Sequence, residues 1–205
     1  MPITPTVKQL LIINIFFFIG TYFIGDVAYV HLGLFPFDNP AFRPWQLLTH
    51  MFMHFGIAHI AFNMFALYSF GSALEHFWGG KKFLFFYLSC GLGAGLLQNA
   101  INYLNGDVNS IAVGASGAIY GLLTAFAFMF PNAQLGLMFI PIPIKAKYFV
   151  PGILALDLFL GLKGGSIFGG SGTGIAHFAH IGGALIGFIM MWYWKKNSFN
   201  NHRWN

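Results

Sequence analysis

Residues 114–120 read Gly114-Ala115-Ser116-Gly117-Ala118-Ile119-Tyr120, within a stretch that carries no charged residue from Val108 to Ile144. Uncharged runs of this length are typical of helices that lie in lipid. A second apolar segment carries a histidine among small residues, in the run Ala179-His180-Ile181-Gly182-Gly183. The serine between glycines and the histidine in another segment predict a nucleophile and its base that meet inside a helix bundle.

The composition favours a membrane protein. Only 7% of the 205 residues are charged, 57% are hydrophobic, and the mean hydropathy is +0.69. Soluble domains carry about 25% charged residues, so this chain has too little polar surface to cover a water-exposed globule. The net charge of +5 does not indicate nucleic acid, because the basic residues occur in short clusters between apolar runs. The single cysteine, Cys90, is expected to act as a small buried hydrophobe.

Six apolar segments are candidates to cross the membrane, which takes about 20 residues of helix. The sequence therefore predicts an all-α membrane protein, a six-transmembrane helix bundle that forms one domain over residues 1–205. The predicted spans are 9–27, 56–74, 83–103, 112–130, 148–162 and 175–194. Segments rich in proline or glycine separate some of them, namely 28–55, 131–147 and 163–174. The short fifth span and the 163–174 loop are expected to form a lateral gate and a cap.

The distribution of basic residues predicts the orientation. With alternating sides, two basic residues, Arg43 and Lys163, fall on one side of the membrane. The other eight fall on the opposite side: Lys8, Lys81, Lys82, Lys145, Lys147, Lys195, Lys196 and Arg203. The positive-inside bias then places both termini in the cytoplasm. In this topology Ser116, His180 and His59 all lie toward the outer ends of their spans.

The polar residues of three spans supply the parts that acyl transfer requires: a nucleophile, a base and donors for the oxyanion. Ser116 would be the nucleophile and His180 the base. Tyr120 lies on the same helix face as Ser116, four residues further on. His59 and Asn63 share a face in the same way, and both side chains can donate hydrogen bonds.

Two pairs of glycines predict close packing of the fourth and sixth spans. Gly117 and Gly121 form one small-residue ridge, and Gly183 and Gly187 form the other. Ridges of this kind allow helix backbones to approach closely in a membrane. Close packing would bring His180 within hydrogen-bonding distance of Ser116.

The chain resembles the rhomboid intramembrane serine proteases in their six-span form. The matching elements occur in order along the chain: Phe52-x-His54, His59-x3-Asn63, Phe70-Gly71-x2-Leu74-Glu75, Gly114-Ala115-Ser116-Gly117 with Tyr120, and Ala179-His180-x2-Gly183-x3-Gly187. A Gly-x-Ser-Gly motif alone would be a weak signal, whereas the ordered set is specific. One departure concerns the first loop, where many members have Trp-Arg and this chain has Trp45-Gln46.

The resemblance implies a Ser116–His180 dyad without a third carboxylate. It also implies an oxyanion hole built from the Ser116 N–H, His59 and Asn63, and a Tyr120 ring that orients the imidazole. Gly114, Gly117 and His54 would support the site, with His54 bonding the first loop. No cofactor and no metal are implied. The expected partners are the lipid bilayer and transmembrane protein substrates, for a multi-pass protein of the bacterial inner membrane.

Two other classes of function stay open at this point. A metal-dependent membrane hydrolase could use the histidines, because His50-x3-His54 and His177-x2-His180 have ligand-like spacing. Against it, the chain has no HExxH motif and few carboxylates. A transporter or channel could also place polar groups at membrane depth.

Four further polar residues have less defined roles in the sequence. Asp157, in the fifth span, is expected to be buried and hydrogen-bonded. Glu75 is expected to cap a loop or to pair with Lys81 or Lys82. His50 and His177 are expected at interface or loop positions.

Overall fold

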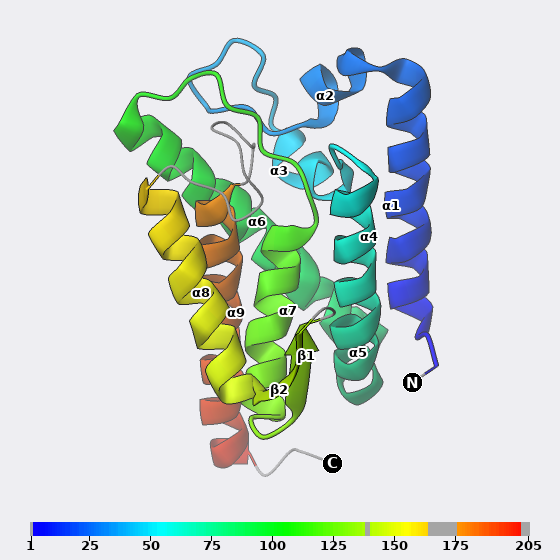
Figure 1. Ribbon diagram of the computed structural model, residues 1–205, viewed down its shortest axis with the longest axis vertical. Helices are drawn as coiled ribbons and strands as arrows, with labels where there is room; N and C mark the ends of the chain where they lie inside the picture. The colour runs from blue at the N-terminus through cyan, green and yellow to red at the C-terminus, as the bar shows by residue number, and fades with distance from the viewer. Residues whose placement is uncertain (1, 138–139, 164–175, 202–205) are drawn as a thin grey trace.

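The computed structural model describes residues 2–137, 140–163 and 176–201 as a bundle of helices (Figure 1). Its long helices are α1 (Pro5–Ile24), α6 (Gly80–Asn105), α8 (Ala146–Lys163) and α9 (His177–Asn201). The shorter helices are α2 (Asp26–Leu32), α3 (Gln46–Thr49), α4 (Ile57–Ala66), α5 (Ser72–Trp78) and α7 (Ser116–Met129). A 3-10 turn, η1 (His50–Phe52), follows α3, and a π-helical turn, η2 (Leu67–Gly71), joins α4 to α5.

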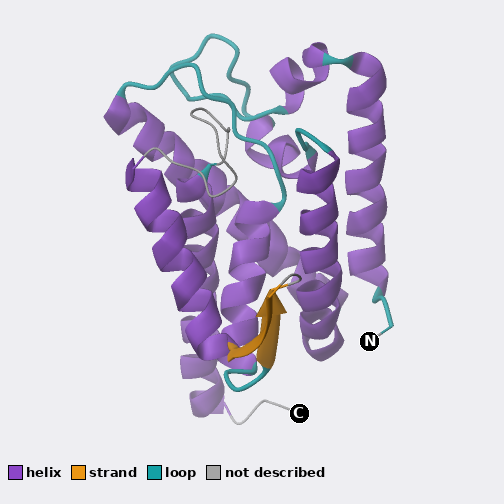
Figure 2. Ribbon diagram, in the orientation of Figure 1, coloured by secondary structure: helices purple, strands orange, loops and turns teal. Residues whose placement is uncertain are grey.

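Three helical stretches of the described chain are long and apolar enough to cross a membrane: Pro5–Ile24, Ile57–Trp78 and Gly80–Asn105. The chain is therefore a multi-pass, mostly helical membrane protein. The prediction of an entirely α-helical fold is wrong in one place. The 131–147 connection, expected to be non-helical, contains an antiparallel hairpin of β1 (Gln134–Leu137) and β2 (Ile140–Lys145), shown in orange in Figure 2.

The first predicted span, 9–27, differs from the helix at both ends. Helix α1 begins four residues earlier, with Pro5 in its first turn, where the missing N–H of proline costs nothing. It ends before Gly25, which has a positive φ of 70°, a conformation that favours glycine. Asp26 then begins the separate helix α2. The predicted span extends past this break because Phe23 and Ile24 before it and Val27 after Asp26 are apolar.

Helix α7 is shorter than the predicted fourth span, 112–130. It has 14 residues and begins at Ser116, and the segment before it runs down into the bundle (Figure 1). The backbone of that segment bonds to the first loop. Leu34 and Ala112 exchange two hydrogen bonds of 2.9 and 3.0 Å, and the Gly114 N–H donates to the His50 carbonyl over 2.9 Å. Non-helical backbone at membrane depth is tolerated where protein satisfies it in this way.

Helices α6, α7 and α9 pack together at the centre, with α8 against α7 and α9 (Figure 1). A Cβ on Gly183 would collide with the Gly117 backbone, and one on Gly187 would lie 2.9 Å from the Gly121 Cα. These contacts confirm the predicted close packing of the two glycine pairs. Cys90 is fully buried, as expected.

Glu75 fixes α1 to the rest of the bundle. This buried carboxylate, on α5, accepts hydrogen bonds from the Thr6 N–H at 2.9 Å, the Val7 N–H at 2.8 Å and the Thr4 hydroxyl. The first N–H groups of a helix have no intrahelical partner, and a negative charge there is stabilising. Glu75 therefore caps the N-terminus of α1. The expectation was that it would cap a loop or pair with Lys81 or Lys82, and the cap is that of a helix.

Candidate active site

Ser116 and His180 come together between α7 and α9. The Ser116 Oγ lies 2.8 Å from the His180 Nε2. Both residues sit in the N-terminal turn of their helix, and the glycine contacts described above bring these turns together. A hydroxyl at this distance from an imidazole nitrogen can transfer its proton to the ring, which is the first requirement of nucleophilic catalysis.

Tyr120 packs flat on the His180 ring. The two ring centroids lie 4.2 Å apart with an interplanar angle of 7°. Ser116 and Tyr120, one turn apart on α7, thus touch the same imidazole at its edge and its face. The stack restricts rotation of the His180 ring and holds Nε2 toward the serine.

His59 lies on the other side of Ser116, against Gly114. A Cβ on Gly114 would be 2.8 Å from the His59 Nε2 and 3.5 Å from the Ser116 Oγ. Gly114 also has a φ of 125°, which residues with a side chain rarely adopt. Both its conformation and the space around it therefore require glycine at this position.

The predicted oxyanion donors lie on α4 and α7. Asn63 is buried, and its Nδ2 donates one hydrogen bond of 2.8 Å to the His59 carbonyl. The side-chain amide nitrogen of asparagine carries two N–H donors. Asn63 can therefore donate one hydrogen bond to the backbone of its own helix and still offer the second N–H to a substrate. Ser116 is the first residue of α7, so its N–H has no acceptor within the helix.

Two buried histidines, His50 and His54, lie in the chain between α3 and α4. His50 is buried, with its Nδ1 2.8 Å from the Gln46 carbonyl. The buried His54 ring packs edge-on against His59 at a centroid distance of 5.0 Å. Burial lowers the pKa of His50 to about 4 and that of His54 to about 3, so both rings are neutral near pH 7.

The expectation that the His54 side chain bonds the first loop is wrong. Neither ring nitrogen of His54 has a hydrogen-bond partner among the described residues. Its backbone carbonyl makes the connection instead, accepting a hydrogen bond of 2.8 Å from the Tyr29 hydroxyl.

Gln46 anchors the first loop in the place where the resemblance led us to expect arginine. Its side chain is fully buried. The Nε2 donates to the backbone carbonyls of Val30 and Ala41. The Oε1 accepts from the backbone N–H groups of Phe35 and Arg43. The amide thus uses both donor and acceptor capacity, which a guanidinium could not do.

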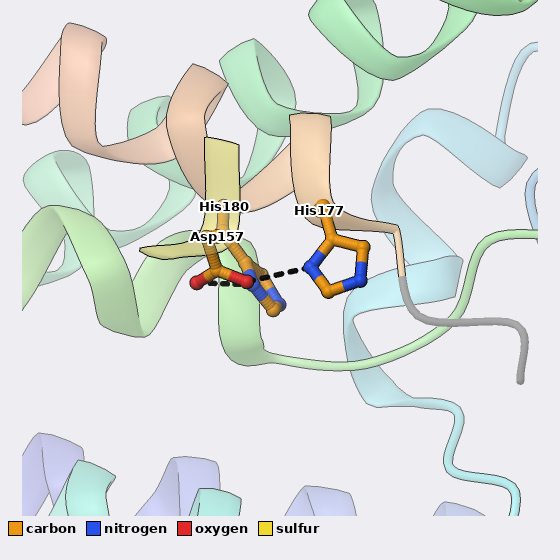
Figure 3. A group of neighbouring side chains, drawn as sticks. All are labelled: Asp157, His177 and His180. Carbon is orange, nitrogen blue, oxygen red and sulfur yellow. Dashed lines mark hydrogen bonds and ion pairs between the residues drawn. The ribbon is translucent and has the colours of Figure 1, made fainter. Parts of the chain in front are cut away.

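Asp157 and His177 also lie at the site, which the sequence predicted for neither residue. Asp157 accepts hydrogen bonds from both histidines, with its Oδ2 3.2 Å from the His180 Nδ1 and its Oδ1 2.6 Å from the His177 Nδ1 (Figure 3). The expected burial and hydrogen bonding of Asp157 are confirmed. The expected interface or loop position of His177 is wrong, because it is the first residue of α9 and is buried. The resemblance implies a dyad without a third carboxylate; the structure places the Asp157 carboxylate beside His180, and whether it takes part in catalysis is not shown by this contact.

The predicted lateral gate and cap lie only partly within the described residues. Of the proposed gate and cap, α8 is described, whereas residues 164–175 are not. Nothing in the structure therefore bears on a cap formed by the glycine-rich loop.

These features define a class: a multi-pass helical membrane protein with a serine and a histidine in hydrogen-bonding contact between two closely packed helices. The comparison with protein families agrees, since the Rhomboid domain matches residues 41–197. The chain belongs to the rhomboid family.

Several curated relatives are similar to this chain over most of its length. The human presenilin-associated rhomboid-like protein, mitochondrial, is 32% identical over 162 residues, which are 76% of this chain and 39% of that protein. The Rhomboid-like protein 11, chloroplastic, of Arabidopsis thaliana is 32% identical over 158 residues, covering 76% of this chain and 54% of the relative. The Rhomboid protease GluP of Bacillus subtilis is 35% identical over 146 residues, covering 71% and 25%. The chain thus spans about two fifths of the length of its mitochondrial relatives.

Proposed function

We propose that this chain is an intramembrane serine endopeptidase that cleaves transmembrane segments of membrane proteins, with Ser116 as nucleophile and His180 as general base. The observation that carries the proposal is the 2.8 Å contact between the Ser116 Oγ and the His180 Nε2. Membership of the rhomboid family, which includes a relative named as a protease, supports it independently.

The reaction follows from the orientation of these two groups. The Ser116 hydroxyl proton passes to the His180 Nε2 as the Oγ–carbon bond forms at the scissile carbonyl. Collapse of the tetrahedral intermediate breaks the carbon–nitrogen bond, and the same Nε2 gives its proton to the leaving amine. Water then adds to the acyl carbon as its proton passes to the His180 Nε2. Collapse of this second tetrahedral intermediate breaks the carbon–Oγ bond and releases the carboxylic acid product, and His180 returns the proton to the Ser116 Oγ.

The negative charge on the carbonyl oxygen needs donors in the tetrahedral state. The Ser116 N–H, the second Asn63 N–H and the His59 ring are the proposed set. Ser116 begins α7, the His59 ring lies against Gly114 two residues before the serine, and Asn63 is one turn after His59 on α4. Such preorganised donors are each worth about 10² to 10³ in rate. Tyr120 would hold the imidazole by the stack described above.

The finer topology belongs to the same proposal. The domain of residues 1–205 would cross the membrane six times with both termini in the cytoplasm, in the inner membrane of a bacterial cell. Ser116, His180 and His59 would then lie toward the outer side, and the substrates would be proteins with a transmembrane helix.

Covalent labelling tests the nucleophile. The purified protein in detergent should react with a fluorophosphonate probe, and mass spectrometry should find the adduct on Ser116. Ser116→Ala should abolish labelling and cleavage of a model transmembrane substrate. Ser89→Ala, which removes a serine from α6, and Cys90→Ala, which removes the thiol, should both keep them. Full cleavage by Ser116→Ala would exclude the proposal.

A metal-dependent hydrolase is the second candidate, because one observation favours it. Asp157, His177 and His180 place one ligand atom each within 4.8 Å of one another, and two histidines with a carboxylate can bind a divalent metal. The two candidates respond differently to EDTA. Loss of cleavage with EDTA, restored by zinc, would favour the metal enzyme, whereas a serine protease should keep its full rate.

A further inference from the structure

The Asp157 carboxylate faces the His180 ring (Figure 3), at the nitrogen opposite the one that contacts Ser116. The imidazole lies between the two groups: its Nε2 is 2.8 Å from the Ser116 Oγ, and its Nδ1 is 3.2 Å from the Asp157 Oδ2. Three helices, α7, α9 and α8, thus contribute one member each to a continuous hydrogen-bonded line.

An ionised Asp157 fixes the tautomer of His180. A carboxylate has no proton to donate, so the Nδ1 of His180 must carry the hydrogen in this contact. The Nε2 then presents its lone pair to the Ser116 hydroxyl. This is the only neutral tautomer that can accept the serine proton, and hydrogen bonding at the other nitrogen is what selects it.

His177 holds the carboxylate in place. Its Nδ1 lies 2.6 Å from the Asp157 Oδ1, so one imidazole occupies each oxygen. The Asp157 side chain is only 10% exposed. A buried carboxylate is costly unless it is hydrogen-bonded, and here both of its oxygens are.

We infer that Asp157 is a positioning residue that completes a Ser116–His180–Asp157 relay, with His177 orienting the carboxylate. The inference rests on the proposed function, in which His180 takes the serine proton. Asp157 stays ionised throughout: it selects the His180 tautomer, aligns the ring and stabilises the imidazolium that forms when the proton arrives. The chemistry resembles that of soluble serine proteases, in which an aspartate has the same role toward the base.

The first test replaces the carboxylate by an amide of the same shape. Asp157→Asn can donate an N–H to the His180 Nδ1 and so favours the tautomer that cannot accept the serine proton. In serine proteases with an established triad this change costs about 10⁴ in kcat. Here the carboxylate is shared with a second histidine, so we expect a fall of about 10²-fold in kcat and in the rate of fluorophosphonate labelling, with little change in KM.

Matched variants separate positioning from structure. Asp26→Asn makes the same chemical change at an exposed carboxylate on α2 and should leave the kcat unchanged. Asp157→Glu, which keeps the charge, should recover part of the kcat. His177→Gln, whose amide can still donate to Asp157, should lose less activity than His177→Leu, which removes the hydrogen bond to the Oδ1.

The melting temperature of each variant is measured in parallel. If Asp157→Asn does not fold, the His177 pair decides, because it changes the orientation of the carboxylate without removing it. Wild-type kcat in folded Asp157→Asn, or equal rates in His177→Gln and His177→Leu, would overturn the relay.

Failure of the relay can be told apart from failure of the proposed function. The relay fails when the wild-type protein labels at Ser116 and the Asp157 variants label equally fast. The proposed function fails when the wild-type protein does not label at Ser116. In that second case nitrogen-15 NMR of the histidines still tests the structural part. The His180 resonances should report the Nδ1–H tautomer in the wild-type protein and lose it in Asp157→Asn.

Discussion

The backbone of Gly114 lies directly against the His59 imidazole, so that a Cβ on the glycine would be 2.8 Å from the ring Nε2. This contact ties the loop that leads into Ser116 to the start of α4, which carries the proposed oxyanion donor His59. The position of His59 relative to Ser116 therefore depends on the absence of a single methyl group.

Gly114→Ala should reduce both stability and activity. The methyl group would displace the His59 ring, and alanine at a φ of 125° would add strain of about 1–3 kcal/mol. We expect a lower melting temperature and a fall in cleavage rate of at least about tenfold, since oxyanion donors act only at the correct position. Gly106→Ala is the matched control, because Gly106 also has a positive φ, 66°, with open space around it. It should lower the melting temperature and leave the rate per folded molecule unchanged. Equal activity in the two variants would contradict the role of this contact.

Asn63→Ala and His59→Ala should retain weak cleavage, in contrast to Ser116→Ala. Each would remove one donor to the oxyanion, and loss of such a donor typically costs about 10² to 10³ in rate, or roughly 3–4 kcal/mol. The serine supplies the attacking atom itself. Initial rates on one substrate, with thermal stability checked in parallel, should show the double variant slower than either single variant. If both single variants keep the wild-type rate, neither residue is an oxyanion donor.

Gln46→Leu should destabilise the first loop. The substitution keeps much of the side-chain volume but leaves the backbone groups bonded by Gln46 without partners. An unsatisfied buried polar group costs about 1–3 kcal/mol. We expect a clear drop in melting temperature and faster proteolysis in the loop before α4. Gln134→Leu, at an exposed position of β1, should change neither, and an equally stable Gln46→Leu would show that the loop does not depend on this amide.

Reporter fusions test the proposed topology. The excess of basic residues on one side predicts that a reporter at Asn205 reads as cytoplasmic and that one in the 104–110 loop reads as external. The two fusions control each other, since a reporter that is inactive in both would indicate a failed insertion. A C-terminus outside the cell would contradict the six-span arrangement.

The sequence predicted the contacts that depend on helical spacing. Glycines four residues apart predicted the packing of α7 on α9, and with it the meeting of Ser116 and His180. The shared face of Ser116 and Tyr120 is likewise a property of helix geometry. The catalytic roles assigned to these residues stay predictions.

What the sequence did not predict depends on how separate segments meet. Asp157 and His180 are 23 residues apart in the chain, and their contact depends on the crossing of α8 and α9, which no local pattern specifies. The start of α7 at Ser116 is set by hydrogen bonds to the first loop, such as those between Leu34 and Ala112. The spacing of His177 and His180 is apparent in the sequence. The contact between them through a carboxylate becomes apparent only when the structure places Asp157 against both rings.

The π-helical turn η2 sets the direction in which the second half of one continuous helical stretch, Ile57–Trp78, presents its side chains. It lies between α4, which carries the proposed oxyanion donors His59 and Asn63, and Glu75, which caps α1. A π-helical turn contains more residues than the 3.6 of an α-helical turn, so Leu67–Gly71 rotates the chain less than five α-helical residues would. In an uninterrupted α-helix of the same sequence, Glu75 would be rotated about the helix axis away from the N-terminus of α1 while His59 and Asn63 kept their places. The π-helical turn thus sets the direction of the α1 contact separately from that of the proposed donors.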